Sequence, residues 1–473
     1  MSGSTLSPSS EKGISSHPAL GRVTFFAGAA SLGGFLFGYD SAVINGAVTG
    51  IQVHFHVSSG ETGTVVAAAL LGSAAGAAIA GRLADLLGRL WVMHIAAALF
   101  AISAIGSSFP RNVWELGAWR VLAGAAIGLA SVIGPTYIAE VAPTIYRGRL
   151  ASFQQMGIVL GITASQLANY AIAQGAGGKS QNHLGSLHAW QWMLMAAAVP
   201  ALAYLVLSFM IPESPRWLIT AGRVERAREV LASIEESTAD ARVADIQHSL
   251  RTEHKPRVRD VIGGRFGLLP IVWIGIGIAV FQQLVGINVI FYYSSILWQS
   301  VGIDQSNSLL ISLSTSIVNI IGTIIAMALI DRVGRKPLAL VGSAGMTVSL
   351  AVAAWAFSYK SGHGDKISIP EAQGAVALVA AHFFVFFFAV SWGVILWVMV
   401  GEMFPLKLRA TAISAATAFN WIANWAVTES FPRLSDWNLS GTYVVYSVFA
   451  LISLGFVARF VSETNGRELD DMG

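Results

Sequence analysis

The most constraining feature of the sequence is a set of long apolar runs that recur along almost the whole chain. A helix needs about 20 apolar residues to cross the hydrocarbon core of a bilayer, which is about 30 Å thick. The runs are unbroken and lack the alternation of barrel strands, so we predict twelve transmembrane helices. They lie near residues 22–50, 62–82, 91–110, 113–135, 150–172, 190–211, 268–298, 306–330, 337–357, 376–401, 408–430 and 441–461.

The composition supports an all-α polytopic membrane protein and excludes several other classes. Hydrophobic residues make up 54% of the chain and charged residues only 12%, whereas soluble domains carry about a quarter charged residues. The chain has no Cys, which excludes a disulfide scaffold and thiol catalysis. The net charge of +3 is too small to predict a nucleic-acid partner. The sequence shows no nucleophile–base, phosphate-loop or metal-ligand pattern, so we predict no enzyme activity, cofactor or metal.

Lys and Arg are distributed unequally between the loops on the two sides of the membrane. With the N-terminus in the cytoplasm, 23 of the 29 fall in cytoplasmic segments and five outside, as the positive-inside rule requires. The first 20 residues lack the features of a cleaved signal peptide, so we expect the first span to be retained. Both termini are therefore expected inside. The expected segments are a tail at 1–21, a six-helix half at 22–211, a cytoplasmic linker with short helices at 212–267, a second half at 268–461 and a tail at 462–473.

Three charged markers of the first half return in the same order in the second half. The copies lie 246 to 262 residues apart, which indicates parallel duplication of a six-span unit. Such paired halves are typical of transporters whose substrate site lies between them and opens to one side at a time. Asp85-x-x-Gly-Arg89 returns as Asp331-x-x-Gly-Arg335, Glu140 to Arg147 as Glu402 to Arg409, and Glu213-Ser-Pro, more faintly, as Glu463-Thr.

Several motifs resemble the major facilitator superfamily and, within it, the sugar porter family. They are Gly81–Arg89, Glu140–Arg147, Pro212–Leu218, Gln282–Asn288 and Ser462–Arg467. The resemblance covers nearly the whole chain. It implies a secondary active transporter in the cell membrane that imports a monosaccharide, hexose or pentose, by alternating access. The family includes bacterial proton–xylose and proton–glucose symporters and the facilitative glucose transporters of animals. The chain departs from the family pattern at Leu90 and Ser462, and at Val394 and Leu396, which replace prolines thought to kink span ten.

Two charges lie deep in the predicted spans, Asp40 in span one and Arg120 in span four. A charge at that depth costs roughly 2.5–3.5 kcal/mol even on insertion scales, so each is the other's best candidate partner. One hypothesis is a static salt bridge that braces the two spans. The other is a proton site, in which protonation of Asp40 releases Arg120, which itself stays charged. The resemblance favours the proton site, because symporters of the family have Asp here and animal facilitators have Asn.

Amide and aromatic side chains within the spans predict a sugar site. Sugar hydroxyls both donate and accept hydrogen bonds, as carboxamides do, and an aromatic plane suits the face of the ring. For any single amide the alternative is a hydrogen bond between helices. Gln166 and Asn424 rank lower than the positions that match the family. The resemblance maps sugar contacts onto Gln155, Gln282, Gln283, Asn288, Asn319, Trp397, Asn420 and Trp421.

Span seven needs a break if Gln282 and Asn288 are both to face one ligand. They are six residues apart, which rotates them by about 240° on a straight helix at about 100° per residue. Gly286 lies between them, and we expect it to break the helix, as substrate-binding spans of transporters often do. Tyr292 and Tyr293 follow by one turn and are candidates for an outer gate or for ordinary packing.

The inner ends of the spans carry charges that recur in both halves. The simplest interpretation is solvated loop charge, whereas the resemblance implies inter-helix ion pairs that join when the inner side closes and part when it opens. The family pattern does not explain His382 or Glu429; we expect His382 to pack with satisfied hydrogen bonds and Glu429 to be solvated. The inner charges are Asp85, Arg89, Glu140, Arg147, Glu213, Arg216, Asp331, Arg335, Glu402 and Arg409.

Three other functions are weighed against proton symport. A proton-independent facilitator of the same fold is the main alternative. An exporter of small apolar cations would need a deep carboxylate without a paired Arg, and a transporter-like sugar sensor usually carries a long cytoplasmic tail. The expected partners are a monosaccharide, a proton and the lipid bilayer, and we expect the monomer to be the functional unit.

Overall fold

The computed structural model describes residues 19–143, 146–235, 238–252, 261–263, 267–361, 368–404 and 406–464. The first half consists of α1 (Leu20–Phe55), α2 (Ser59–Leu87), α3 (Arg89–Ser108), α4 (Val113–Val141), α5 (Arg147–Gly175), α6 (Ala189–Ala196) and α7 (Ala198–Ser208). The second half consists of α11 (Pro270–Leu284), α12 (Ile287–Gln299), α13 (Gln305–Val333), α14 (Arg335–Phe357), α15 (Glu371–Val390), α16 (Trp392–Glu402) and α17 (Leu406–Phe460).

The predicted fold class is confirmed. Within the described ranges, eleven helical stretches are long and apolar enough to cross a membrane. The last of them, α17, has 55 residues, or about 80 Å at a rise of about 1.5 Å per residue, which is long enough for two spans. Asn438 interrupts it with non-helical angles (φ −158°, ψ 94°). This residue lies between the predicted spans eleven and twelve, so the eleven stretches correspond to twelve spans.

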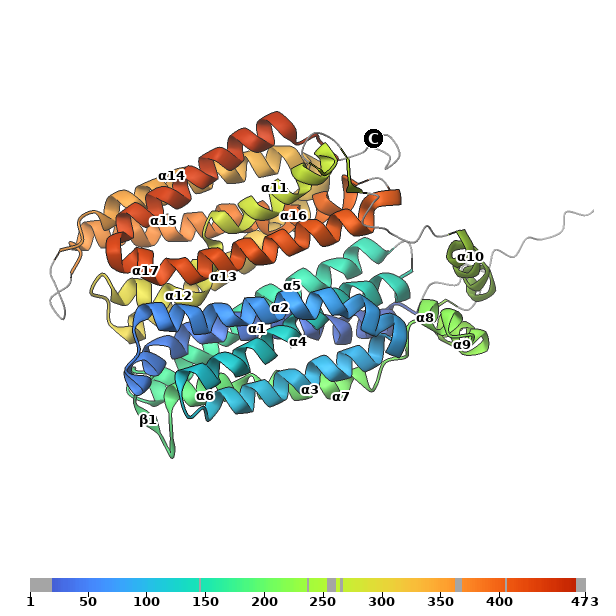
Figure 1. Cartoon of the computed structure of the whole chain (residues 1–473), viewed down its shortest axis with the longest axis horizontal. Coiled ribbons are helices and arrows are strands. Elements are labelled where there is room, and N and C mark those ends of the chain that lie inside the picture. Colours follow the sequence, from blue (N-terminus) through green and yellow to red (C-terminus); the bar gives the residue numbers. More distant parts are fainter. Residues whose placement is uncertain are drawn as a thin grey trace, which may run out of the picture.

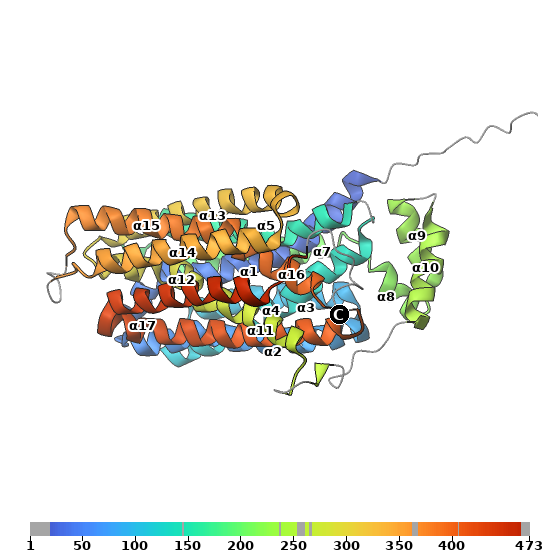
Figure 2. The ribbon, with the colours of Figure 1, turned by 90° about the horizontal axis from the view of Figure 1, so that it is seen from above.

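The two halves form two adjacent groups of roughly parallel helices (Figure 1). They meet along α1 with α12, α2 with α17 and α5 with α13. Three short helices, α8 (Pro215–Thr220), α9 (Val224–Ile234) and α10 (Ala239–Thr252), stand off one end of the bundle (Figure 2). We call that end the inner end. The opposite, outer end carries the short antiparallel pair β1 (His183–Leu184) and β2 (Leu187–His188).

Small residues allow the closest helix contacts inside the first half. A Cβ added at Gly72 of α2 would lie 2.1 Å from the Val121 carbonyl oxygen, and one at Gly124 of α4 would lie 1.9 Å from the Ala69 oxygen. Any side chain at these positions would force α2 and α4 apart. These two glycines therefore allow close packing of α2 against α4.

Span seven is broken where the sequence predicts. Gly286 has φ +82° and separates α11 from α12, a conformation that glycine adopts without steric cost. Span ten is broken as well, although the chain lacks the family's prolines there. The break falls at Ser391 (φ −127°, ψ −91°), between α15 and α16, where the Ser391 hydroxyl donates to the Phe387 carbonyl.

The short inner helices pack against the first half. The backbone N–H of Ala19 donates to the Ile234 carbonyl of α9 at 2.8 Å, and Arg22 donates to the Ser233 carbonyl at 2.9 Å. Helix α9 is amphipathic and buries Ala227, Val230 and Leu231, as its residue spacing predicts. Helices α8 and α9 of the linker therefore pack with the first half.

Candidate functional site

The two deep charges form an ion pair with each other. Arg120 Nη1 on α4 lies 2.9 Å from Asp40 Oδ2 on α1 and also donates to the Asp40 backbone carbonyl at 3.3 Å. The two side chains are only 3% and 7% exposed. Arg120 Nε is buried and finds no hydrogen-bond partner in the described part of the chain. The pairing predicted from the cost of burial is present, and it joins two helices of the same half.

Five carboxamides form a continuous hydrogen-bonded group, here called the amide cluster. It consists of Gln282, Gln283, Asn288, Asn420 and Asn424. Gln283 Nε2 donates to Gln282 Oε1 and to Asn420 Oδ1, both at 3.2 Å. Asn288 Nδ2 donates to Gln283 Oε1 at 2.7 Å and to Asn424 Oδ1 at 2.8 Å. The cluster therefore links α11, α12 and α17 in the middle of the second half.

The break at Gly286 brings the cluster together. It places Asn288, at the start of α12, within hydrogen-bonding distance of Gln283, near the end of α11. Asn424 was ranked low from sequence, but it belongs to the group because it lies one helical turn beyond Asn420 on the same face of α17. The sequence signal that identifies it is this four-residue spacing.

The other predicted sugar contacts lie outside this hydrogen-bonded group. Gln155 on α5 is half-buried, Asn319 on α13 is 6% exposed and Trp397 on α16 is 47% exposed. Trp421 on α17 is 7% exposed, and its ring centre lies 5.9 Å from that of Phe37 on α1. Trp421 thus packs across the boundary between the halves.

The two tyrosines of α12, Tyr292 and Tyr293, contact residues beside the amide cluster. Tyr293 donates its hydroxyl hydrogen to the Thr428 carbonyl of α17 at 3.1 Å. Tyr292 lies next to Asn424 of the cluster and next to Ser41, the neighbour of Asp40. Both side chains are buried. Tyr292 therefore stands between the amide cluster and the Asp40–Arg120 pair.

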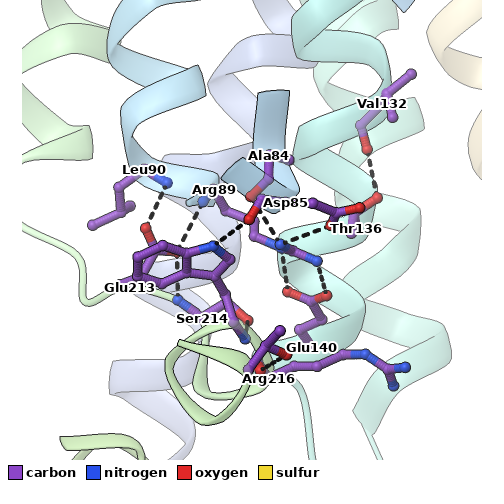
Figure 3. A network of polar contacts seen from close by, with 12 residues as sticks. Ala84, Asp85, Arg89, Leu90, Val132, Thr136, Glu140, Glu213, Ser214 and Arg216 are labelled. Carbon is purple, nitrogen blue, oxygen red and sulfur yellow. Dashed lines mark hydrogen bonds and ion pairs between the residues drawn. The ribbon is translucent and has the colours of Figure 1, made fainter. Parts of the chain in front are cut away.

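The repeated charges form equivalent ion pairs in the two halves. Arg89 donates from Nε and Nη2 to the two carboxylate oxygens of Glu140, at 3.0 and 2.9 Å (Figure 3). Arg335 makes the same two-point contact with Glu402, at 3.1 and 2.9 Å. Asp85 forms a further, exposed ion pair with Arg89 at 3.4 Å, and Asp331 forms one with Arg335 at 3.0 Å. Each of these pairs joins helices within one half.

The third repeated marker, Glu213 with its counterpart Glu463, also makes equivalent contacts in the two halves. Glu213 accepts hydrogen bonds from the first backbone N–H groups of α3, Arg89 at 3.0 Å and Leu90 at 3.2 Å (Figure 3). Glu463 accepts from the equivalent groups of α14, Arg335 at 3.0 Å and Lys336 at 2.9 Å. A helix N-terminus favours a carboxylate. Burial nevertheless raises the pKa of Glu213, opposed by these hydrogen bonds and by Arg89.

Three remaining inner charges complete the predicted set. Arg216 lies in α8 and belongs to the polar network drawn in Figure 3. The side chains of Arg147 and Arg409 lie outside the described residues.

His382 and Glu429 have different outcomes. The His382 ring nitrogens lie 2.8 Å from the Ser314 hydroxyl and 2.8 Å from the Leu378 carbonyl, so the predicted satisfied histidine is confirmed. Glu429, which we expected to be solvated, is only partly so. Its side chain is only 18% exposed and accepts from Arg433 at 2.7 Å and from Thr64 at 3.0 Å. Thr64 belongs to α2 of the other half, a proximity that the sequence does not encode locally.

Two six-helix halves, helices broken in the membrane and a buried polar cluster define a multi-pass membrane transporter of the major facilitator fold. Residues 26–473 match the family profile described as sugar (and other) transporter. The chain belongs to this transporter family.

Relatives match the chain along almost its full length. It is 48% identical to the glucose transport protein of Synechocystis sp., over 95% of this chain and 97% of that one. It is 34% identical to the D-xylose-proton symporter of Escherichia coli, over 94% and 93%. Among solved structures, the partially occluded inward open conformation of the xylose transporter XylE from E. coli superposes with a TM-score of 0.81 at 33% identity, covering 95% of this chain and 100% of that one.

Proposed function

We propose that the protein imports a monosaccharide, a hexose or a pentose, by proton symport with alternating access. The observation that carries the proposal is the buried Asp40–Arg120 pair, which lies one side chain, Tyr292, away from the amide cluster. The names of the glucose and xylose relatives support the substrate class. The D-xylose-proton symporter supports the coupling.

The amide cluster suits sugar hydroxyls. The carboxamides of the cluster satisfy one another, so the cluster carries few unpaired polar groups. A sugar offers the same donor and acceptor chemistry and can replace these mutual bonds one for one. We assign Gln155, Asn319, Trp397 and Trp421 to the walls of the site, with Trp397 against the ring face. Its 47% exposed indole is available for that contact.

The Asp40–Arg120 pair supplies a proton site. Protonation of Asp40 removes the negative charge and leaves Arg120 buried with a positive charge and no ionic partner. That cost favours a conformation in which Arg120 reaches water or another acceptor. The proton thus changes the energy difference between the outward-facing and inward-facing states, as coupling requires.

The membrane orientation follows from the charge distribution. We infer that both termini and helices α8–α10 lie in the cytoplasm, where most of the Lys and Arg fall. The inner end, as defined here, then faces the cytoplasm, and the outer end with β1 and β2 faces outward.

A facilitator of the same fold is the second candidate. The Asp40–Arg120 pair would then be a brace between α1 and α4, as its full burial also allows. A sugar sensor would bind at the same cluster without net transport.

Uptake into proteoliposomes of a sugar panel, with and without an imposed proton gradient, separates these functions. Symport predicts that at least one hexose or pentose accumulates above its external concentration when the outside is acidic. Equilibration alone would establish a facilitator. Binding without uptake would leave only the sensor.

A further inference from the structure

Asn45 is a fully buried amide that the proposed proton and sugar sites do not use. It lies on α1, five residues from Asp40 toward the outer end, and is 0% exposed. Its Nδ2 group donates to Gln166 Oε1 at 3.0 Å and to Ser312 Oγ at 3.1 Å. Its Oδ1 accepts from the Ser295 backbone N–H at 2.8 Å. Both hydrogens of the carboxamide and its oxygen are therefore bonded.

The partners of Asn45 come from both halves. Gln166 lies on α5 of the first half, whereas Ser295 lies on α12 and Ser312 on α13 of the second. The Asn45 backbone carbonyl also accepts from the Ser295 hydroxyl at 2.5 Å. Gln166 donates in turn to the Phe291 carbonyl of α12 at 3.3 Å. One residue of α1 thus ties the first half to two helices of the second.

Other polar contacts between the halves lie nearer the outer end. Gln299 on α12 donates to Thr49 on α1 at 3.1 Å. Gln305 on α13 donates to the Ser180 hydroxyl at 2.6 Å. The side chains of Gln299 and Thr49 are partly exposed, whereas those of Gln305 and Ser180, like those around Asn45, are buried. Buried hydrogen bonds contribute more to stability than solvent-exposed ones, because their loss leaves polar groups without a partner until water enters.

We propose that Asn45 is the positioning residue of the outer gate: its bonds to Ser295 and Ser312 hold α1 against α12 and α13 and set the population of the outward-closed state. Opening the outer side separates these helices and must break the bonds. This inference rests on the alternating access of the proposed function. It requires neither the sugar assignment nor the proton assignment.

The first half offers a matched control, Asn169. It is also 0% exposed, and it donates from Nδ2 to the Val43 carbonyl at 3.1 Å. Both of these residues belong to the first half. Asn169→Ala therefore removes a buried amide that binds α1 without touching a bond between the halves.

The test is the distance between spin labels at the outer ends of the two halves. The chain has no Cys, so Arg111→Cys and Trp437→Cys give one label on each half. Asn45→Ala should raise the ratio of separated to closed molecules by about tenfold, or about 1.4 kcal/mol, for the loss of its two side-chain bonds to the second half. Asn169→Ala should leave that ratio unchanged. The measurement is made without sugar and at one pH, so its failure would leave the uptake experiment untouched.

A milder variant keeps the test valid if Asn45→Ala does not fold. Ser312→Ala removes a single partner and should shift the ratio in the same direction by a smaller factor, about threefold. An unchanged distance distribution in a folded Asn45→Ala protein, or in Ser312→Ala where only that variant folds, would overturn the proposal. So would an equal shift in Asn169→Ala.

Discussion

Arg120 Nη1 on α4 lies 2.9 Å from Asp40 Oδ2 on α1, and both side chains are less than a tenth exposed. A pair so deeply buried is costly to break by removing one partner alone. In the proposed mechanism, a proton on Asp40 would do this chemically and reversibly. Because Asp40 lies near the amide cluster and on the same helix as Asn45, we expect one protonation event to influence both the proposed sugar site and the proposed outer gate.

Substitutions in the amide cluster should weaken sugar binding. Gln283→Ala and Asn288→Ala each leave bonded carboxamides without a partner. The loss of one hydrogen-bonding partner in a water-poor site costs about 1–3 kcal/mol, which corresponds to roughly a five- to hundred-fold loss of affinity. Calorimetric titration of the folded variants measures this directly. Asn169→Ala is the control, and affinity equal to wild type in both cluster variants would remove span seven from the site.

The inner ion pairs should stabilise each half according to their burial. Glu140→Gln should lower the free energy of unfolding by about 2–4 kcal/mol, because Arg89 and Glu140 are 9% and 10% exposed. Glu402→Gln should cost less, about 1–2 kcal/mol, since Glu402 is 31% exposed. Asp85→Asn, at a 77% exposed side chain, should cost about 0–1 kcal/mol. Thermal unfolding in detergent gives the order.

The same ion pairs also bear on the switch between states. The resemblance to the sugar porter family implies that these ion pairs separate when the inner side opens. In the structure, however, each pair joins helices of the same half. We therefore expect Glu402→Gln to slow transport mainly through loss of rigidity in its half. Inner label distances that shift toward separation without a change in melting temperature would instead support a gating role.

Glu213 should give the stability a pH dependence of known sign. Burial raises its folded pKa above the ordinary value of 4.5, so the folded protein binds this proton more tightly than the unfolded chain. Its contribution to stability is therefore greatest below pH 4.5 and is lost as pH rises through the raised pKa. Glu213→Gln should flatten the melting temperature across that window, while Glu225→Gln, at an exposed position on α9, should not. Equal slopes in both variants would contradict this.

Much of the fold could be predicted from the sequence, because a bilayer restricts the chain to long apolar helices. The Asp40–Arg120 contact followed from the cost of two isolated buried charges. The break at Gly286 followed from the need to aim Gln282 and Asn288 at one place. Both features could be predicted because they depend on the residues of only one or two spans.

Other features depend on distances between the halves, which local sequence does not encode. Asn45 was missed because one amide in span one resembles any other until Ser295 and Ser312 are seen beside it. Glu429 was assigned to solvent because Thr64 lies 365 residues away in the chain. Span ten breaks at Ser391 without the expected prolines, where the Ser391 hydroxyl bonds to the Phe387 carbonyl.

The most direct test of the account is the proton movement that accompanies sugar entry. Wild-type protein in weakly buffered proteoliposomes should make the external medium more alkaline when a transported sugar is added. Asp40→Asn should bind and exchange that sugar yet produce no pH change, because the pair with Arg120 can no longer take up and release a proton. A sugar-dependent pH change of wild-type size in a folded Asp40→Asn protein would contradict the account, as would wild-type uptake with no proton movement.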